Sequence, residues 1–140
     1  MAGTNNLFKI KLPKGWQDQT VHFFMGPKDS GFQHSLTLAI DPKPESDDLI
    51  EFARTYTAPW VQALPNADVL KNEQIHLDDG RPAYEVVCKS VPSEQQVLFH
   101  RRWYVIDHGV GYIFTGVFSK KTMKTIALDV LGIINSLSQP

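Results

Sequence analysis

Three short clusters of turn-forming residues constrain the fold of this chain more than any other feature. They are Asp78-Asp79-Gly80, Pro92-Ser93-Glu94 and Asp107-His108-Gly109. Each cluster separates two stretches rich in β-branched and aromatic residues, and Gly, Pro and Asp are the residues that tight chain reversals require. Residues 69–77, 83–91, 95–106 and 110–118 are therefore predicted to be four strands joined by antiparallel hairpins.

Three further strands are predicted in the first half of the chain. Residues 7–12 alternate apolar and charged side chains, residues 20–25 are rich in aromatic and β-branched side chains, and residues 34–40 alternate again. Each of these stretches is followed closely by a proline or a glycine, which breaks a strand. The whole sheet is then expected to hold about six to seven strands.

Two helices are predicted from apolar residues at helical spacing. The first begins near Ser46, which can cap a helix, and a break or kink is expected at Pro59. The second follows Ser119 or Thr122 and carries an apolar stripe through residues 123–137. No repeat or linker divides residues 1–140, so we predict one α+β domain. It has an antiparallel meander sheet, a helix between strands three and four, and a C-terminal helix packed on the sheet.

The composition excludes several classes of protein. Lys and Arg total 14 against 15 Asp and Glu, and this net charge of -1 argues against a nucleic-acid partner. No apolar stretch approaches the length of a membrane span, so we expect a soluble protein without stable membrane insertion. The N-terminus does not have the pattern of a signal peptide, and Cys88 is the only cysteine, which together predict a cytoplasmic location.

Candidate catalytic and metal-binding side chains do not converge in the predicted strands and turns. The groups are His76 with Asp78 and Asp79, His100 with Arg101 and Arg102, the pair Asp107-His108, and Cys88. Neighbouring strand residues point to opposite faces, so solvated surfaces explain the histidine groups and a buried thiol explains Cys88. The stretch GVG at residues 109–111 matches no phosphate-binding loop. We therefore expect no enzyme activity, no metal and no cofactor.

Three stretches of the sequence resemble one known family. FKIKLPKGWQD at residues 8–18, DGRPAYE at residues 79–85 and GYIFT at residues 111–115 are similar to the DcrB-like family, which shares the PsbP-like fold. A version without a leader peptide resembles the Eag chaperones of bacterial type VI secretion. That resemblance implies a cytoplasmic homodimer. Its sheet surfaces would hold the N-terminal transmembrane helices of a secreted effector until the effector is loaded on the secretion spike.

The alternation within three strands supplies candidate residues for such a cargo surface. The larger apolar residues, such as Leu36 and Leu38, are assigned to the core, and the residues between them to a second sheet face. Small, hydroxyl and amide side chains there would admit a helix and bond its polar atoms. The predicted cargo-binding residues are His22, Phe24, Ser35, Thr37, Ala39, Gln96, Leu98 and His100. A plain solvent face of half-exposed strands explains the same residues.

Two other functions stay open at this point. The chain also fits a small-molecule or lipid carrier with a pocket between sheet and helix, for which Trp16, Trp60 and Trp103 are candidate apolar walls, although all three also fit a core. A weak hydrolase is the third alternative, and a substrate screen with a His100→Ala control would test it. A neighbouring reading frame for a toxin with apolar N-terminal helices would favour the chaperone.

Overall fold

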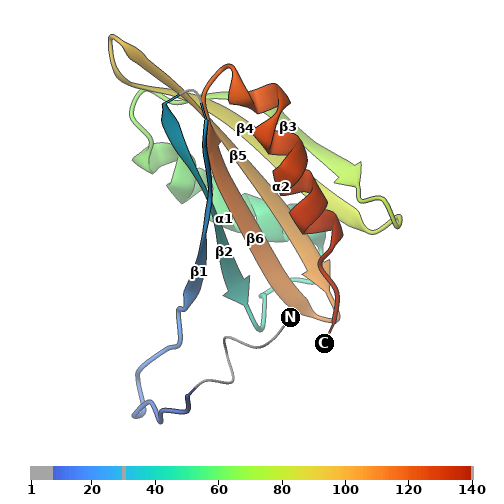
Figure 1. The fold of residues 1–140 in the computed structure, drawn as a ribbon. Helices are drawn as coiled ribbons and strands as arrows, with labels where there is room; N and C mark the ends of the chain where they lie inside the picture. The colour runs from blue at the N-terminus through green and yellow to red at the C-terminus, as the bar shows by residue number, and fades with distance from the viewer. Residues whose placement is uncertain (1–7, 30, 140) are drawn as a thin grey trace.

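A six-stranded antiparallel sheet forms the centre of the protein in the computed structural model, which describes residues 8–29 and 31–139 (Figure 1). The strands are β1 (Val21–Asp29), β2 (Phe32–Asp41), β3 (Asp68–His76), β4 (Pro82–Ser93), β5 (Gln96–Asp107) and β6 (Val110–Phe118). Their order across the sheet is β1-β2-β6-β5-β4-β3. The predicted α+β class and antiparallel meander are confirmed.

Two of the three turn clusters act as predicted, whereas β4 continues through Pro92 and Ser93, so that its reversal into β5 lies at residues 94–95. His108 and Gly109 both have positive φ, 51° and 76°, which lets the chain reverse tightly between β5 and β6. Gly80 has a φ of 93° in the turn between β3 and β4. Consecutive hairpins therefore join β3 to β6, and β2 then pairs with β6 to attach the first part of the chain.

The first helix, α1 (Leu49–Ala63), lies between β2 and β3. Asp48 caps it by accepting hydrogen bonds from the backbone N–H groups of Ile50 and Glu51, at 2.9 and 3.4 Å. The hydroxyl of Ser46, two residues earlier, accepts a 3.0 Å hydrogen bond from the backbone N–H of Asp48. The expected break at Pro59 is wrong, because α1 runs through it. Side chains on both sides of the proline, including Phe52 and Trp60, pack against the sheet and hold the helix together.

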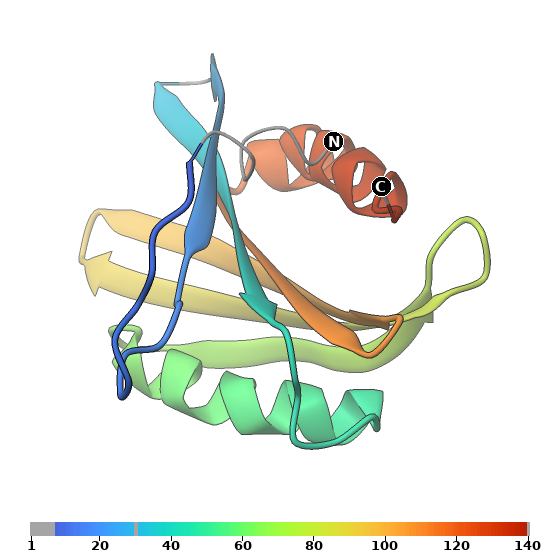
Figure 2. The same cartoon turned by 90° about the horizontal axis from the view of Figure 1, so that it is seen from below.

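The two helices cover opposite faces of the sheet (Figure 2). On one face, Phe52 and Ala53 of α1 pack with Val86, Cys88 and Tyr104. On the other face, a second cluster forms under the C-terminal helix α2 (Ile126–Asn135), which follows a short 3-10 turn, η2 (Thr122–Lys124). Its members include Ile126, Val130, Ile134, Trp103 and Phe114. The C-terminal helix therefore packs on the sheet as predicted.

The strand predicted first in the chain does not form. Residues 8–12 belong to no strand and are exposed throughout, and residue 7 lies outside the described residues. Their alternation is typical of a strand, but no neighbouring strand within the described chain pairs with them. This is why six strands are observed and why α1 follows the second observed strand.

Candidate functional site

The pairing of β1 with β2 decides which side chains share a face. Directly opposed residues of an antiparallel pair point to the same side of the sheet. Val21 lies opposite Ala39, Phe23 opposite Thr37, and Met25 opposite Ser35, and Thr37 lies opposite Thr115 of β6. We call the α1-side surface of these three strands the open face. Its residues are Val21, Phe23, Met25, Ser35, Thr37, Ala39, Thr115 and Val117.

The open face is less covered than the rest of that side of the sheet, because α1 packs mainly over β4 and β5. On the edge strand, Val21, Phe23 and Met25 are 54%, 60% and 71% exposed. The residues from β2 and β6 are half-buried and mostly small. An apolar rim therefore stands beside a shallow floor of methyl and hydroxyl groups.

Arg102 of β5 forms the boundary between α1 and the open face. Its guanidinium lies over the Trp60 ring, 4.4 Å from the centroid. It also donates hydrogen bonds to the Thr115 hydroxyl at 2.9 Å and to the backbone oxygen of Tyr56 in α1 at 3.1 Å. One cationic side chain thus ties the helix to the floor of the open face.

Two buried side chains with polar groups, His100 and Tyr104, lie between α1 and the sheet next to this boundary. His100 is buried, its Nε2 atom lies 2.7 Å from the Ser90 hydroxyl, and its ring makes an edge contact with Trp60. Burial lowers the pKa of His100 and raises the pKa of Tyr104, whose hydroxyl lies 2.6 Å from the hydroxyl of Thr57 in α1. Both groups are therefore held in their neutral forms near neutral pH.

An open groove of about 530 Å³ adjoins the open face where β1 begins. Val21, Ala39 and Ile113 form its apolar part, and residues 17–20 form one wall. Tyr56 closes it from α1 and donates a 2.7 Å hydrogen bond to Asp41, which raises the pKa of Tyr56 to about 12. The groove thus combines an apolar floor with polar walls, in which Tyr56 bonds Asp41 and Thr20 bonds Asp18.

The structure brings together only part of the predicted cargo-binding set. Ser35, Thr37 and Ala39 lie on the open face. Leu98 and His100 point to the same side from β5, but His100 lies under Trp60, and Gln96 is exposed at the start of the strand.

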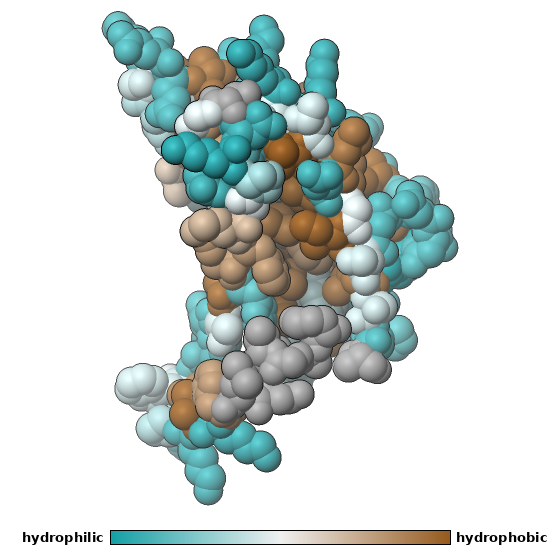
Figure 3. Space-filling view, in the orientation of Figure 1, coloured by the Kyte–Doolittle hydropathy of each residue, from teal (hydrophilic) through white to brown (hydrophobic). Residues whose placement is uncertain are grey.

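The placement of His22 and Phe24 on this face is wrong. They lie opposite Leu38 and Leu36, on the α2 side, where apolar side chains gather between β1 and α2 (Figure 3). The residues that join the open face from this strand are instead Val21, Phe23 and Met25.

The three tryptophans do not form the walls of a common pocket. Trp103 is fully buried on the α2 side, Trp60 is covered by Arg102 on the α1 side, and Trp16 is exposed. None of them lines the groove beside Tyr56. The sequence-based expectation of tryptophan walls is therefore wrong, because it did not separate the two sheet faces.

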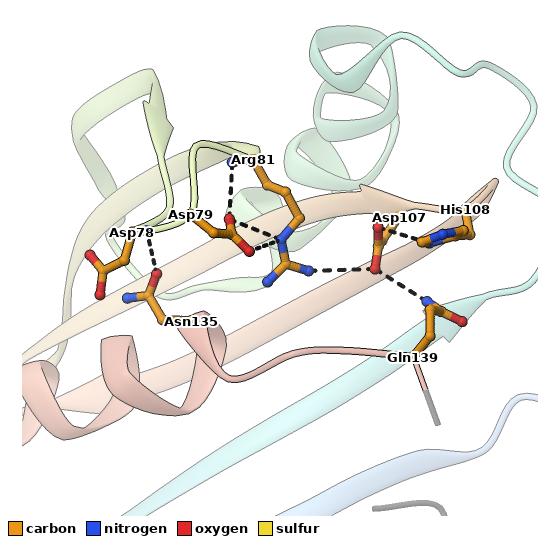
Figure 4. Close-up of polar contacts among 7 residues, drawn as sticks. All are labelled: Asp78, Asp79, Arg81, Asp107, His108, Asn135 and Gln139. Carbon is orange, nitrogen blue, oxygen red and sulfur yellow. Dashed lines mark hydrogen bonds and ion pairs between the residues drawn. The ribbon is translucent and has the colours of Figure 1, made fainter.

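The acidic and histidine residues near the hairpin ends serve structural contacts (Figure 4). Asp107 accepts hydrogen bonds from Arg81 and from Gln139 of the C-terminal tail, at 3.4 and 3.2 Å, and lies 3.1 Å from the ring of His108. Asp79 binds Arg81 as well. Within residues 8–29 and 31–139, no group of three or more His, Cys, Asp or Glu residues is arranged to hold a metal ion.

A buried ionic cluster on the α2 side was missed by sequence reasoning. Glu85 accepts from Arg101 at 2.5 Å and from the Trp103 indole at 2.7 Å, and its other oxygen lies 2.9 Å from Lys71. Burial alone would raise the pKa of Glu85, but these cations outweigh burial and lower it. The one clue in the sequence is an acidic residue inside the apolar run of β4.

None of the described helices is both long enough and apolar enough to cross a membrane.

Comparison with known proteins gives the chain a family. Its fold is similar to PA94, a protein of unknown function from Pseudomonas aeruginosa, with a TM-score of 0.71 at 16% identity over 94% of this chain and 90% of that one. It also resembles the PsbP protein CyanoP of Synechocystis sp. PCC 6803, with a TM-score of 0.51 at 11% identity over 91% and 96% of the two chains. No curated protein matches. The DcrB family model matches residues 9–115, and the chain therefore belongs to the DcrB family.

Proposed function

We propose that this protein is a cytoplasmic chaperone and adaptor without an active site of its own. It holds the apolar N-terminal helices of a type VI secretion effector and helps to load that effector on the secretion spike. The observation that carries the proposal is the open face, where an exposed apolar strand edges a floor of small side chains. The likeness of the sequence to the Eag chaperones supplies the class of cargo.

The chemistry of the open face suits an apolar helix. Small residues let a helix backbone approach closely, and hydroxyl groups bond polar atoms that would otherwise lose their partners outside water. Thr37 and Ser35 supply hydroxyls on the floor, while Phe23 and Met25 supply apolar area at the rim. Methionine side chains adapt to varied partners, which suits a surface that receives another chain.

A homodimer fits the same role. One open face is a single shallow surface, whereas two related by a two-fold axis can enclose cargo from both sides through one repeated interface. Cargo with more than one apolar helix then finds a surface for each.

Co-expression with the apolar N-terminal segment of an effector from a neighbouring reading frame tests the proposal. Thr37→Arg places a long charged side chain on the floor and should abolish co-purification, with stability changed by about half a kcal/mol or less because the site is partly exposed. Ala39→Trp should also block the cargo. Leu38→Ala changes the same strand on the opposite face and should retain the cargo. Normal co-purification by both open-face variants would sink the proposal.

A small-molecule or lipid carrier is the second candidate, and the groove beside Tyr56 favours it. Its volume of about 530 Å³ lies within the usual range for small-molecule sites. Organic extraction of the purified protein followed by mass spectrometry tests this function. A lipid that co-purifies at one molecule per protein, and is lost in a Val21→Arg variant, would support the carrier function. If the extract of the wild-type protein contains no such molecule, the protein does not retain a lipid during purification.

A further inference from the structure

A second groove lies on the side of α1 away from the open face. It runs between α1 and the edge strand β3, which lie side by side (Figure 2). Its volume of about 430 Å³ is within the usual range for small-molecule sites. We call this space the β3 groove, and it shares no lining residue with the groove beside Tyr56. The lining residues that matter for its chemistry are Ile50, Arg54, Ala58, Val61, Val69 and Asn72.

The apolar part of the β3 groove comes from both of its walls. Ala58 and Val61 are three residues apart and share one side of α1 with Ile50, and Val69 faces them from β3. Ile50 and Val69 are 43% and 47% exposed. Both side chains therefore keep apolar surface that a ligand can remove from water, which favours binding.

The charge of the β3 groove comes from one side chain. Among the described residues that line it, Arg54 alone is charged. Arg54 forms an ion pair with Glu51, and the two side chains are 68% and 50% exposed. Ion pairs this exposed contribute little to stability. Because a guanidinium presents paired N–H donors that match a carboxylate, Arg54 can exchange Glu51 for the carboxylate of a ligand at little cost.

The opposite wall adds neutral hydrogen-bond donors. The side-chain oxygen of Asn72 accepts a hydrogen bond from the hydroxyl of Tyr84. The amide nitrogen of Asn72 keeps two N–H donors, for which the described residues supply no partner. The described lining contains no Asp or Glu. The β3 groove thus offers hydrogen-bond donors to an anionic head group and no negative charge to a cationic one.

We propose that the β3 groove binds a single-chain alkyl carboxylate, the chemistry of a medium-chain fatty acid. The carboxylate pairs with Arg54, and the alkyl chain lies over Ala58, Val61 and Val69. From Arg54 to Gln62, α1 extends over about 12 Å, which suits one short chain. This site is separate from the proposed cargo surface and from the groove beside Tyr56, and the proposal depends on neither.

Isothermal titration calorimetry with decanoate, below the concentration at which it forms micelles, tests the site. The wild type should bind one decanoate per chain. Decyltrimethylammonium has the same alkyl chain with the opposite charge, and it should bind at least about tenfold more weakly because Arg54 repels it. Absence of decanoate binding, or equal affinity for the two compounds, would overturn the proposal.

Two exposed variants should shift the affinity for decanoate in opposite directions. Arg54→Gln removes the cation and should weaken binding by about tenfold or more, as expected for loss of a charged hydrogen bond. Glu51→Gln releases Arg54 from its competitor and should strengthen binding by about twofold, which is the value of an exposed ion pair within a helix. Both variants should keep the wild-type melting temperature. Unchanged affinity in both would contradict the role of Arg54.

A matched pair at Ala58 separates charge from bulk. Ala58→Glu and Ala58→Gln add side chains of similar size one turn after Arg54, and both residues suit a helix. Glutamate pairs with Arg54 and repels an anion, so Ala58→Glu should bind decanoate about tenfold more weakly than Ala58→Gln. Val21→Arg, in the groove beside Tyr56, should bind decanoate as the wild type does. Loss of binding in Val21→Arg, with normal binding in Ala58→Glu, would place the ligand in the other groove and refute the proposal.

Discussion

The sheet has two unlike regions. Strands β4, β5 and β6 lie between α1 and α2, and several of their aromatic side chains, such as Trp103 and Phe114, are buried. None of the described helices packs closely on strand β1, and its side chains Phe23 and Met25 are largely exposed. The same residue types thus stabilise the fold in one region and remain available to a partner in the other. The number of apolar residues in a strand does not show which of these roles it has.

The largest expected difference comes from truncating one phenylalanine in each region. Phe114→Ala leaves a cavity under α2 and should lower the free energy of unfolding by about 3 to 5 kcal/mol. Phe23→Ala removes a side chain that is already largely in solvent, so it should change the free energy of unfolding by about 0.5 kcal/mol or less. Urea denaturation measures both values. Similar losses for the two variants would mean that β1 is part of the core.

A smaller effect is expected from the ionic cluster of the covered region. Glu85→Gln removes the charge that compensates Arg101 but keeps an oxygen that can accept from the Trp103 indole. Because Arg101 retains slight exposure and Lys71 is about half exposed, we expect a loss of about 2 kcal/mol in the free energy of unfolding. Glu73→Gln removes an exposed partner of Lys71 and is the matched control. Equal stability of the two variants would show that the cluster is not effectively buried.

The smallest effect concerns pH. Burial holds the pKa of His100 below its ordinary 6.5 in the folded protein, so the unfolded chain takes up the proton first as the pH falls. The stability that neutral His100 contributes is complete above the unfolded-state pKa of 6.5. It decreases as the pH falls below 6.5 towards the lower pKa of the folded state. Thermal unfolding at about pH 8 and about pH 5.5 should therefore show a smaller acid loss in His100→Gln than in the wild type. The lowered pKa of Glu85 acts only below its ordinary 4.5 and does not confuse the comparison. An identical acid loss in the two proteins would contradict a buried neutral His100.

Local chemistry predicted most elements of the fold but not how they lie together. The turn at residues 107–109 and strand β6 were placed correctly, because a hairpin depends on its own few residues. The faces of β1 were not, because alternation gives the period of a strand but not its register against β2. His22 was therefore assigned to the face that Phe23 occupies.

The remaining errors have the same origin in long-range contacts. Pro59 weakens a helix locally, yet α1 continues because residues on both sides of it pack on the sheet. Residues 8–12 have strand periodicity, yet they pair with none of the described strands, because alternation does not specify a pairing partner. The contacts of Arg102 were not predicted, since nothing in its own strand indicates Trp60, Tyr56 and Thr115 as its partners.

The position of β2 beside β6 has a consequence for folding during synthesis. Strands β1 and β2 leave the ribosome first, but the strand that anchors them is the last one made. Pairing between the two ends of a chain closes a long loop and is slow compared with formation of successive hairpins. The meander from β3 to β6 can therefore assemble as a unit before β2 pairs with β6, and until then the apolar side chains of the β1–β2 hairpin remain exposed. Amide hydrogens of β1 should accordingly exchange with solvent fastest among the strands.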